Sequence, residues 1–196
     1  MKISQCFSHL TSVLIFTIAS GCAYGPQFIS IDPEVNVSEG DFLETKEIAL
    51  EILDSRTQTK LGVVGDDSAR FNIELKGDLP TVISPKLTKA LENRGLLVRE
   101  QSETTKKLVV NIQRMTIDSV KTKSFGYKTD LHVELLATVV KDNSKFAKRF
   151  VVTTEKKMGS FSSSAETQKI VNEALSDALS SIVNDEALFE LLHTDS

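Results

Sequence analysis

The sequence contains no tryptophan, only two cysteines and only three histidines among its 196 residues. Two cysteines cannot build a disulfide framework, and so few cysteines and histidines leave little material for a zinc site. The 23 basic residues are outnumbered by 27 acidic ones, giving a net charge of −4, so the overall charge does not indicate a nucleic-acid-binding protein. We therefore expect no metal, no cofactor and no nucleic-acid partner.

A long apolar run is also missing. The most apolar segment, Leu10–Ala19, covers ten residues, whereas a membrane-spanning helix needs about 20. With 40% hydrophobic and 26% charged residues, the chain has the composition of one ordinary globular domain rather than a disordered or polytopic membrane protein.

The short apolar run belongs to a segment with the three parts of a secretory signal. Lys2 supplies a basic start, the apolar run follows, and small residues lead up to Cys22. Small residues before a cysteine are typical of the bacterial lipobox, although Ala19 stands where Leu is more usual. There a peptidase cuts before a cysteine whose sulfur carries diacylglycerol and whose new amine takes a further acyl chain, such as palmitate. We predict a signal peptide over residues 1–21 and lipidation at Cys22; an ordinary signal with an incidental cysteine is the alternative.

The residue after Cys22 bears on which membrane would hold the lipid. An aspartate at that place usually means retention in the inner membrane of Gram-negative bacteria, and this chain has Ala23. The sequence therefore favours the periplasmic face of the outer membrane. Two or three acyl chains make such anchoring stable, whereas one chain holds a protein only marginally.

The mature chain divides into a polar stretch and a domain. Residues 22–46 are rich in Gly, Pro, Ser, Asn and acids, and we interpret them mainly as a tether averaging about 27 Å end to end if flexible. Alternating apolar residues at Phe28, Ile31, Val35 and Val37 could instead form a short strand at the domain edge. Residues 47–196 are expected to form a single domain.

Period-two patterns predict the strands of this domain. Residues 47–54 and 70–75 alternate in hydrophobicity, which predicts a long hairpin around a loop containing Gly62 and Gly65. The strand 108–120 changes its apolar phase, which predicts a β-bulge near Gln113 and Arg114. Residues 127–135 and 146–152 are expected to pair as an antiparallel hairpin through a turn at 141–144.

Two amphipathic helices complete the pattern. The first is expected to begin at the cap Ser84 and to end at Gly95. The second begins at the capping box Ser163–Glu166 and breaks near Asn184, with one or two further helical turns after it. We predict an α+β fold: a two-layer sandwich whose sheet is mainly antiparallel, with about five or six strands and the two helices on one face.

The serial order of several short motifs resembles the YajG-type lipoproteins, small lipidated periplasmic proteins of Gram-negative bacteria. The resemblance covers most of the mature chain, and it rests on Cys22 after a signal, Asp54-Ser55-Arg56 with Leu61-Gly62, Arg94-Gly95, Gly126-Tyr127 before Asp130-Leu131, Gly159-Ser160-Phe161, and a helix containing Asn172 that leads to Asp185 and Phe189-Glu190-Leu191-Leu192. The resemblance implies a lipid-anchored domain without assigned chemistry, and it carries over no catalytic residue.

Charged residues supply the candidate contact sites. Asp54 and Arg56 lie two apart at a strand end and so point the same way, which suits either a structural pair or a recognition site for a partner. Lys148 and Arg149 belong to a set of basic residues around the central hairpin: Lys121, Lys123, Lys128, Lys141, Lys145, Lys148, Arg149, Lys156 and Lys157. These could contact lipid head groups or an acidic partner, or they could protect an edge strand from aggregation.

The sequence offers few candidates for a set of catalytic residues. A hydrolase would have to use Ser160 or His132, but Ser160 precedes a helix cap and His132 is out of phase with the apolar face of its strand. We therefore expect a non-catalytic envelope protein, anchored by lipid, that binds or supports another envelope component. The alternative is a carrier of a small amphiphilic ligand in a cavity lined by Leu87, Leu131 and Leu175; the oligomeric state stays open.

Overall fold

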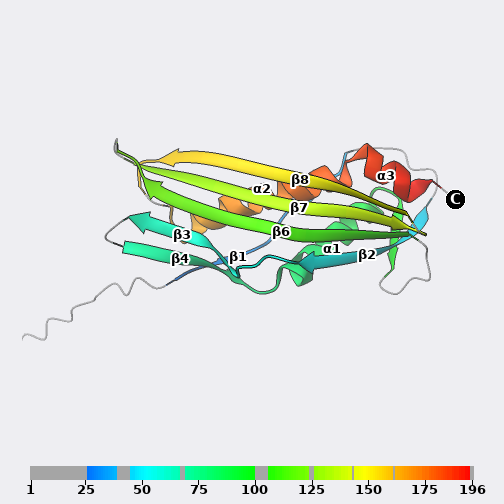
Figure 1. The fold of residues 1–196 in the computed structure, drawn as a ribbon, viewed down its shortest axis with the longest axis horizontal. Helices are drawn as coiled ribbons and strands as arrows, with labels where there is room; N and C mark the ends of the chain where they lie inside the picture. The colour runs from blue at the N-terminus through cyan, green and yellow to red at the C-terminus, as the bar shows by residue number, and fades with distance from the viewer. Residues whose placement is uncertain are drawn as a thin grey trace, which may run out of the picture.

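The computed structural model describes residues 26–38, 45–66, 69–99, 106–123, 126–142, 144–160 and 162–194. In chain order these form β1 (Gln27–Ser30), β2 (Lys46–Asp54), β3 (Lys60–Asp66), β4 (Ala69–Lys76), α1 (Leu79–Glu92), β5 (Leu96–Arg99), β6 (Lys106–Lys121), β7 (Tyr127–Lys141), β8 (Ser144–Met158), α2 (Ser164–Val183) and α3 (Glu186–His193). The described strands make one eight-stranded sheet that curls into a half-barrel, with the helices against its inner face (Figure 1).

The long strand β6 organises the sheet. One of its edges pairs with β7 over nearly its whole length, and β7 pairs in turn with β8. The other edge pairs with β2 along residues 107–112 and with β3 at residues 117–118, so β2 and β3 lie one after the other along the same side. The sheet therefore divides beyond β6: β5 lies next to β2, whereas β4 and then β1 lie next to β3.

This topology confirms the α+β class and corrects the expected sheet. Four of the strand pairings are parallel (β1–β4, β2–β5, β2–β6 and β3–β6), and three are antiparallel, so the sheet is mixed rather than mainly antiparallel. The strand number also exceeds the five or six expected. β2 and β3 both pair in parallel with β6 because the chain keeps its direction from β2 into β3. β4 reverses that direction, and α1 then returns the chain so that β5 pairs in parallel with β2.

The expected hairpin between residues 47–54 and 70–75 is wrong. Its supposed loop forms a strand of its own, β3, which pairs with β4. Gly62 makes this possible because a Cβ built at that position would lie 1.6 Å from the carbonyl oxygen of Ile117 on β6. The glycine here permits close approach of two backbones rather than a turn.

Other local expectations are confirmed. The register between β6 and β7 shifts between Ile112 and Arg114, where the change of apolar phase placed a bulge. The antiparallel pairing of β7 with β8 runs from Tyr127 opposite Met158 to Lys141 opposite Ser144. Because successive side chains alternate between faces, the buried residues of both strands all point toward the helices.

The helices agree with the sequence at three of their four expected boundaries. The Ser163 hydroxyl accepts a hydrogen bond from the Glu166 amide at 3.2 Å, α2 ends at Val183, and α1 ends shortly before Gly95. The start of α1 is wrong by about one and a half turns, because Asp78 caps the helix through the Thr81 amide at 3.0 Å. Pro80 in the first turn fits that start, and Pro85 lies inside the helix.

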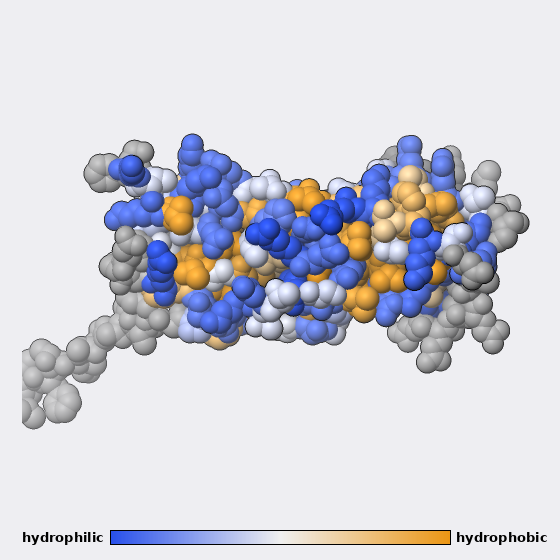
Figure 2. Space-filling model, in the orientation of Figure 1, coloured by the Kyte–Doolittle hydropathy of each residue, from blue (hydrophilic) through white to orange (hydrophobic). Residues whose placement is uncertain are grey.

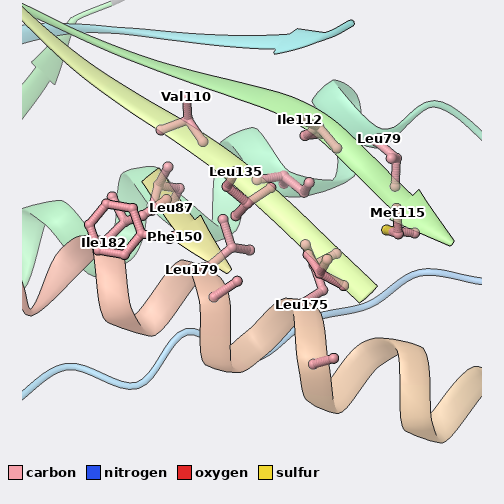
Figure 3. Packing of buried hydrophobic residues seen from close by; sticks show 14 of the residues in the cluster. Leu79, Leu87, Val110, Ile112, Met115, Leu135, Phe150, Leu175, Leu179 and Ile182 are labelled. Carbon is pink, nitrogen blue, oxygen red and sulfur yellow. The ribbon is translucent and has the colours of Figure 1, made fainter. Parts of the chain in front are cut away.

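One contiguous core fills the space between the sheet and the helices. Figure 3 shows Leu175, Leu179 and Ile182 of α2 beneath Leu135 and Phe150 of the sheet. Each of these five side chains is at most 9% exposed. Burying a side chain of this size contributes about 1.5–3 kcal/mol, so this packing is the main source of stability.

The N-terminal segment, which we call the strap (residues 27–38), runs alongside α2. Alternate strap amides donate to a row of polar side chains four residues apart on the helix: Ser30 to Gln168, Asp32 to Asn172, Glu34 to Ser176, Asn36 to Ser180 and Ser38 to Asn184, all at 2.8–2.9 Å. The two spacings match because two extended residues rise about 6.6 Å and four helical residues about 6 Å.

The other residues of the strap face the core. Ile29 is fully buried and Ile31 is 6% exposed, while Val35 and Val37 pack against the same cluster. We expected residues 22–46 to act mainly as a tether, but residues 27–38 are part of the folded domain. The alternative of a short edge strand is what β1 provides, in parallel pairing with β4.

Candidate functional site on the outer face of the sheet

Asp54 and Arg56 form a bidentate ion pair where β2 ends. Arg56 donates from Nε to Oδ1 and from Nη2 to Oδ2 of Asp54, both at 2.8 Å, and its backbone amide donates to Oδ1 at 3.2 Å. The Arg56 side chain is only 9% exposed and that of Asp54 24%. These hydrogen bonds from Arg56 lower the pKa of Asp54 below its ordinary value, so the pair stays charged through neutral pH.

The pair lies at a gap in the sheet. Pairing of β6 with β2 ends at Ile112 and pairing with β3 begins at Gly62 opposite Ile117, so no described strand covers this edge of β6 between those residues. The bulge falls in the same interval. The result is a groove of about 440 Å³, which we call the Arg56 groove, lined by Arg56, Thr57, Gln58, Lys60, Gln113, Arg114, Met115, Thr116 and Glu134.

Positive charge exceeds negative charge in this groove. Arg56, Lys60 and Arg114 line it together with one acid, Glu134. Glu134 already forms an ion pair with Arg149 Nε at 3.2 Å and lies 3.5 Å from His132 Nε2. Neither the Lys60 side chain nor the Arg114 side chain has an ion-pair or hydrogen-bond partner among the described residues, and the buried Nη1 atom of Arg56 has no hydrogen-bond partner there. The arrangement suits an anionic group such as a carboxylate or phosphate.

The surroundings of the groove are mixed in polarity. Figure 2 shows hydrophilic side chains on this face interspersed with apolar ones, without a single continuous apolar patch. Among the large apolar side chains, Leu53 is 38% exposed and Val151 is 49% exposed. A mixture of polar and apolar side chains of this kind is typical of non-obligate protein–protein interfaces.

The four residues singled out by the sequence do not all meet. Asp54 and Arg56 contact each other, and Arg149 joins the groove through Glu134. Lys148 points to the opposite face of β8, where it forms an ion pair with Asp185 at the start of α3. Lys148 therefore ties the end of the sheet to the helical layer. Cys22 lies outside the described residues.

Three charged residues that line the groove were not predicted as site residues from the sequence. Lys60, Arg114 and Glu134 come from β3, β6 and β7, which are far apart along the chain and meet only in the folded sheet. The one local signal was the phase switch at Gln113 and Arg114, because bulges often occur beside functional sites.

The residues considered for catalysis are apart. His132 contacts Thr153 at 3.3 Å and Glu134 at 3.5 Å, whereas Ser160 lies beyond the end of β8. The described part of the chain contains no group of three or more His, Cys, Asp or Glu side chains placed to hold a metal ion. The residues expected to line a carrier cavity, Leu87, Leu131 and Leu175, are each at most 1% exposed within the packed core.

Comparison with models of protein families shows which family the chain belongs to. A family model described as "Uncharacterized lipoprotein" matches residues 33–193. The chain belongs to this lipoprotein family. This confirms the resemblance to YajG-type lipoproteins, and it makes the chain a membrane-anchored lipoprotein of the cell envelope. None of the helices in the described residues is long and apolar enough to cross a membrane.

The chain is also similar to several solved structures. Protein XCC0632 from Xanthomonas campestris is 12% identical, with 80% of this chain and 92% of that chain covered and a TM-score of 0.53, which shows a similar fold. A minor lipoprotein from Acinetobacter baumannii is 10% identical (76% and 92% covered, TM-score 0.38). The rare lipoprotein B from Shewanella oneidensis is 13% identical (73% and 96% covered, TM-score 0.37). No curated protein sequence matches the chain.

Proposed function

We propose that this lipoprotein is anchored through Cys22 at the periplasmic face of the outer membrane and binds an anionic group of another envelope component in the Arg56 groove. The role is a binding or supporting one without catalysis. The observation that carries the proposal is the set of cations around the groove, of which Lys60 and Arg114 have no partner in the described structure.

The chemistry of the groove supports an anionic partner in two ways. A buried guanidinium whose Nη1 lacks a hydrogen bond is costly, and an incoming oxygen close to it would offset part of that cost. The ion pair with Asp54 fixes the guanidinium plane, so the arginine is already ordered before a ligand arrives. Anchoring to a bilayer raises the effective concentration of both partners, so a modest affinity is sufficient.

The alternative role as a carrier of an amphiphilic ligand has less support. It needs an apolar cavity between helices and sheet, and Leu87, Leu131 and Leu175 instead pack against their neighbours in the core. The accessible groove has charged walls, which suit an anionic group better than an acyl chain.

Photo-crosslinking in intact cells tests the proposed contact. With a photoreactive amino acid at Gln58, we expect a discrete crosslinked product whose yield falls about tenfold in a Lys60→Glu/Arg114→Glu variant, because reversing two cations converts attraction into repulsion. The matched control reverses two exposed lysines outside the groove, Lys89→Glu/Lys145→Glu, and should leave the yield unchanged.

The outcome that contradicts the proposal is also specific. If the photoreactive residue at Glu173, on the exposed side of α2, gave the same products as Gln58, the groove would not be the contact site. The same conclusion would follow if the charge reversal at Lys60 and Arg114 had no more effect than the reversal at Lys89 and Lys145.

A further inference from the structure

The strap sets how far the domain can lie from its lipid. The strap begins at Gln27, so only residues 23–26 separate Cys22 from the folded domain. Five Cα–Cα steps span at most about 18 Å even when fully extended. A flexible tether of residues 23–46 would have averaged about 27 Å. The start of β1 must therefore stay close to the bilayer that holds the lipid.

Contacts identify which end of the domain this is. The Gln27 side chain lies 3.5 Å from the carbonyl oxygen of Ser162, and the Ser162 hydroxyl lies 3.7 Å from the sulfur of Met158. Met158 pairs with Tyr127 at the start of β7. The start of β1 is therefore next to the end of β8 and the connection between β6 and β7, at the left end of the molecule in Figure 1.

Exposed lysines gather at this end. Lys123 is exposed and Lys156 half-buried, and neither has a partner among the described residues; the nearest carboxylate oxygen to Lys157, from Glu155, is 3.9 Å away. Lys128 holds Asp130 at 3.0 Å and Glu155 at 3.1 Å, which neutralises those two acids. Exposed apolar side chains accompany the lysines: Val120 is 52% exposed and Phe28 48% exposed.

Acidic residues are also near this end: Asp118 on β6, Asp66 at the end of β3 and Glu166 in the first turn of α2. Asp118 is exposed and lies three strand pairs back from the end of β6, opposite Asp130, whereas Lys121 is opposite Tyr127 at the end itself. Three strand residues correspond to about 10 Å. Lys121, Lys123 and Lys157 therefore lie nearer the end of the sheet than Asp118 does.

We infer that this end of the domain rests on the membrane surface, with Lys123, Lys156 and Lys157 contacting the phosphates of anionic lipid head groups. The inference rests on the proposed anchor at Cys22. Lysines close to an anionic bilayer are attracted to it, so three of them favour one orientation of a domain that the lipid already holds at the surface. The opposite end, where β7 turns into β8 and α3 ends, then points away from the bilayer.

Depth-dependent quenching tests the orientation on the full lipidated protein in phosphatidylcholine–phosphatidylglycerol vesicles. Cys6 leaves with the signal and Cys22 carries lipid, so a single introduced cysteine takes the fluorophore. Gly159→Cys places it at the membrane end, where a Cβ meets nothing within 4 Å, and Lys145→Cys places it at the far end. Spin-labelled head groups should quench the label at 159 at least threefold more than the label at 145.

Two further variants separate the causes. A 20-residue Gly/Ser insertion after Tyr24 should abolish the difference between 159 and 145 while the protein stays bound. Lys123→Gln/Lys156→Gln/Lys157→Gln should reduce quenching at 159 about twofold or more in anionic vesicles, and Lys89→Gln/Lys145→Gln, at exposed lysines elsewhere on the domain, should not.

Three results would each contradict a different part of the inference: the orientation, the head-group contact or the anchor. Equal quenching at 159 and 145 in the unmodified chain would overturn the orientation. Unchanged quenching in the lysine variant would overturn the head-group contact. If Cys22 of the mature protein carried no lipid, or if the unlipidated protein bound vesicles as well as the lipidated one, the anchor would be overturned, and with it the proposed function.

Discussion

A Gly62→Ala variant is expected to lose about 4 kcal/mol or more of its free energy of unfolding, enough to unfold much of the protein. The added Cβ would lie 1.6 Å from the carbonyl oxygen and 2.7 Å from the carbonyl carbon of Ile117. Both are backbone atoms of the central strand β6, so they cannot rotate away as a side chain would. Losses above 4 kcal/mol are exceptional for single substitutions and need a specific mechanism of this kind. Urea unfolding followed by circular dichroism measures the loss.

Gly159→Ala is the matched control for this variant. A Cβ at Gly159 meets nothing within 4 Å, so the free energy of unfolding should change by no more than about 0.5 kcal/mol. If Gly62→Ala were as stable as Gly159→Ala, β3 could not approach β6 as closely as described. The division of the sheet into two branches would then be incorrect.

An Ile29→Ala variant is expected to lose about 2–4 kcal/mol of the free energy of unfolding. Ile29 is fully buried in β1, and removing it leaves a cavity under the strap. The neighbouring Phe28 is the control because it points outward and is 48% exposed, so Phe28→Ala should change stability by about 0.5 kcal/mol or less. Thermal unfolding of the chain from residue 23 onward, without lipid, compares the two.

The pair of variants distinguishes a structural strap from a tether. If residues 27–38 were only a linker, neither substitution would change the unfolding midpoint. That outcome would also remove the basis for placing one end of the domain near the membrane, since the linker would then be about 24 residues long.

Local patterns predicted the parts of the fold that depend on neighbouring residues. The β7–β8 hairpin, the bulge near Gln113 and the cap at Ser163 each follow from the chemistry of a few consecutive residues. Pairing between distant strands carries no such local signal. Gly62 is equally suited to a turn or to close backbone approach, and only the position of Ile117 decides between them.

The strap and the Arg56 groove also depend on contacts between residues that are far apart in the sequence. The alternating apolar residues of the strap were visible, but its hydrogen-bond acceptors are a polar row on α2 that begins some 138 residues later, at Gln168. The pairing of Asp54 with Arg56 was predictable because the residues are two apart. Arg114 and Glu134 reach the same groove only because β6 and β7 pair in register at those residues.

The most direct test of the account is the mass of the mature N-terminal peptide isolated from the membrane fraction. We expect a peptide that begins at Cys22 and carries the added mass of a diacylglycerol thioether and a further acyl chain. A peptide that begins elsewhere, or an unmodified cysteine at position 22, would contradict the central claim that only four residues separate the lipid anchor from the first strand of a folded domain.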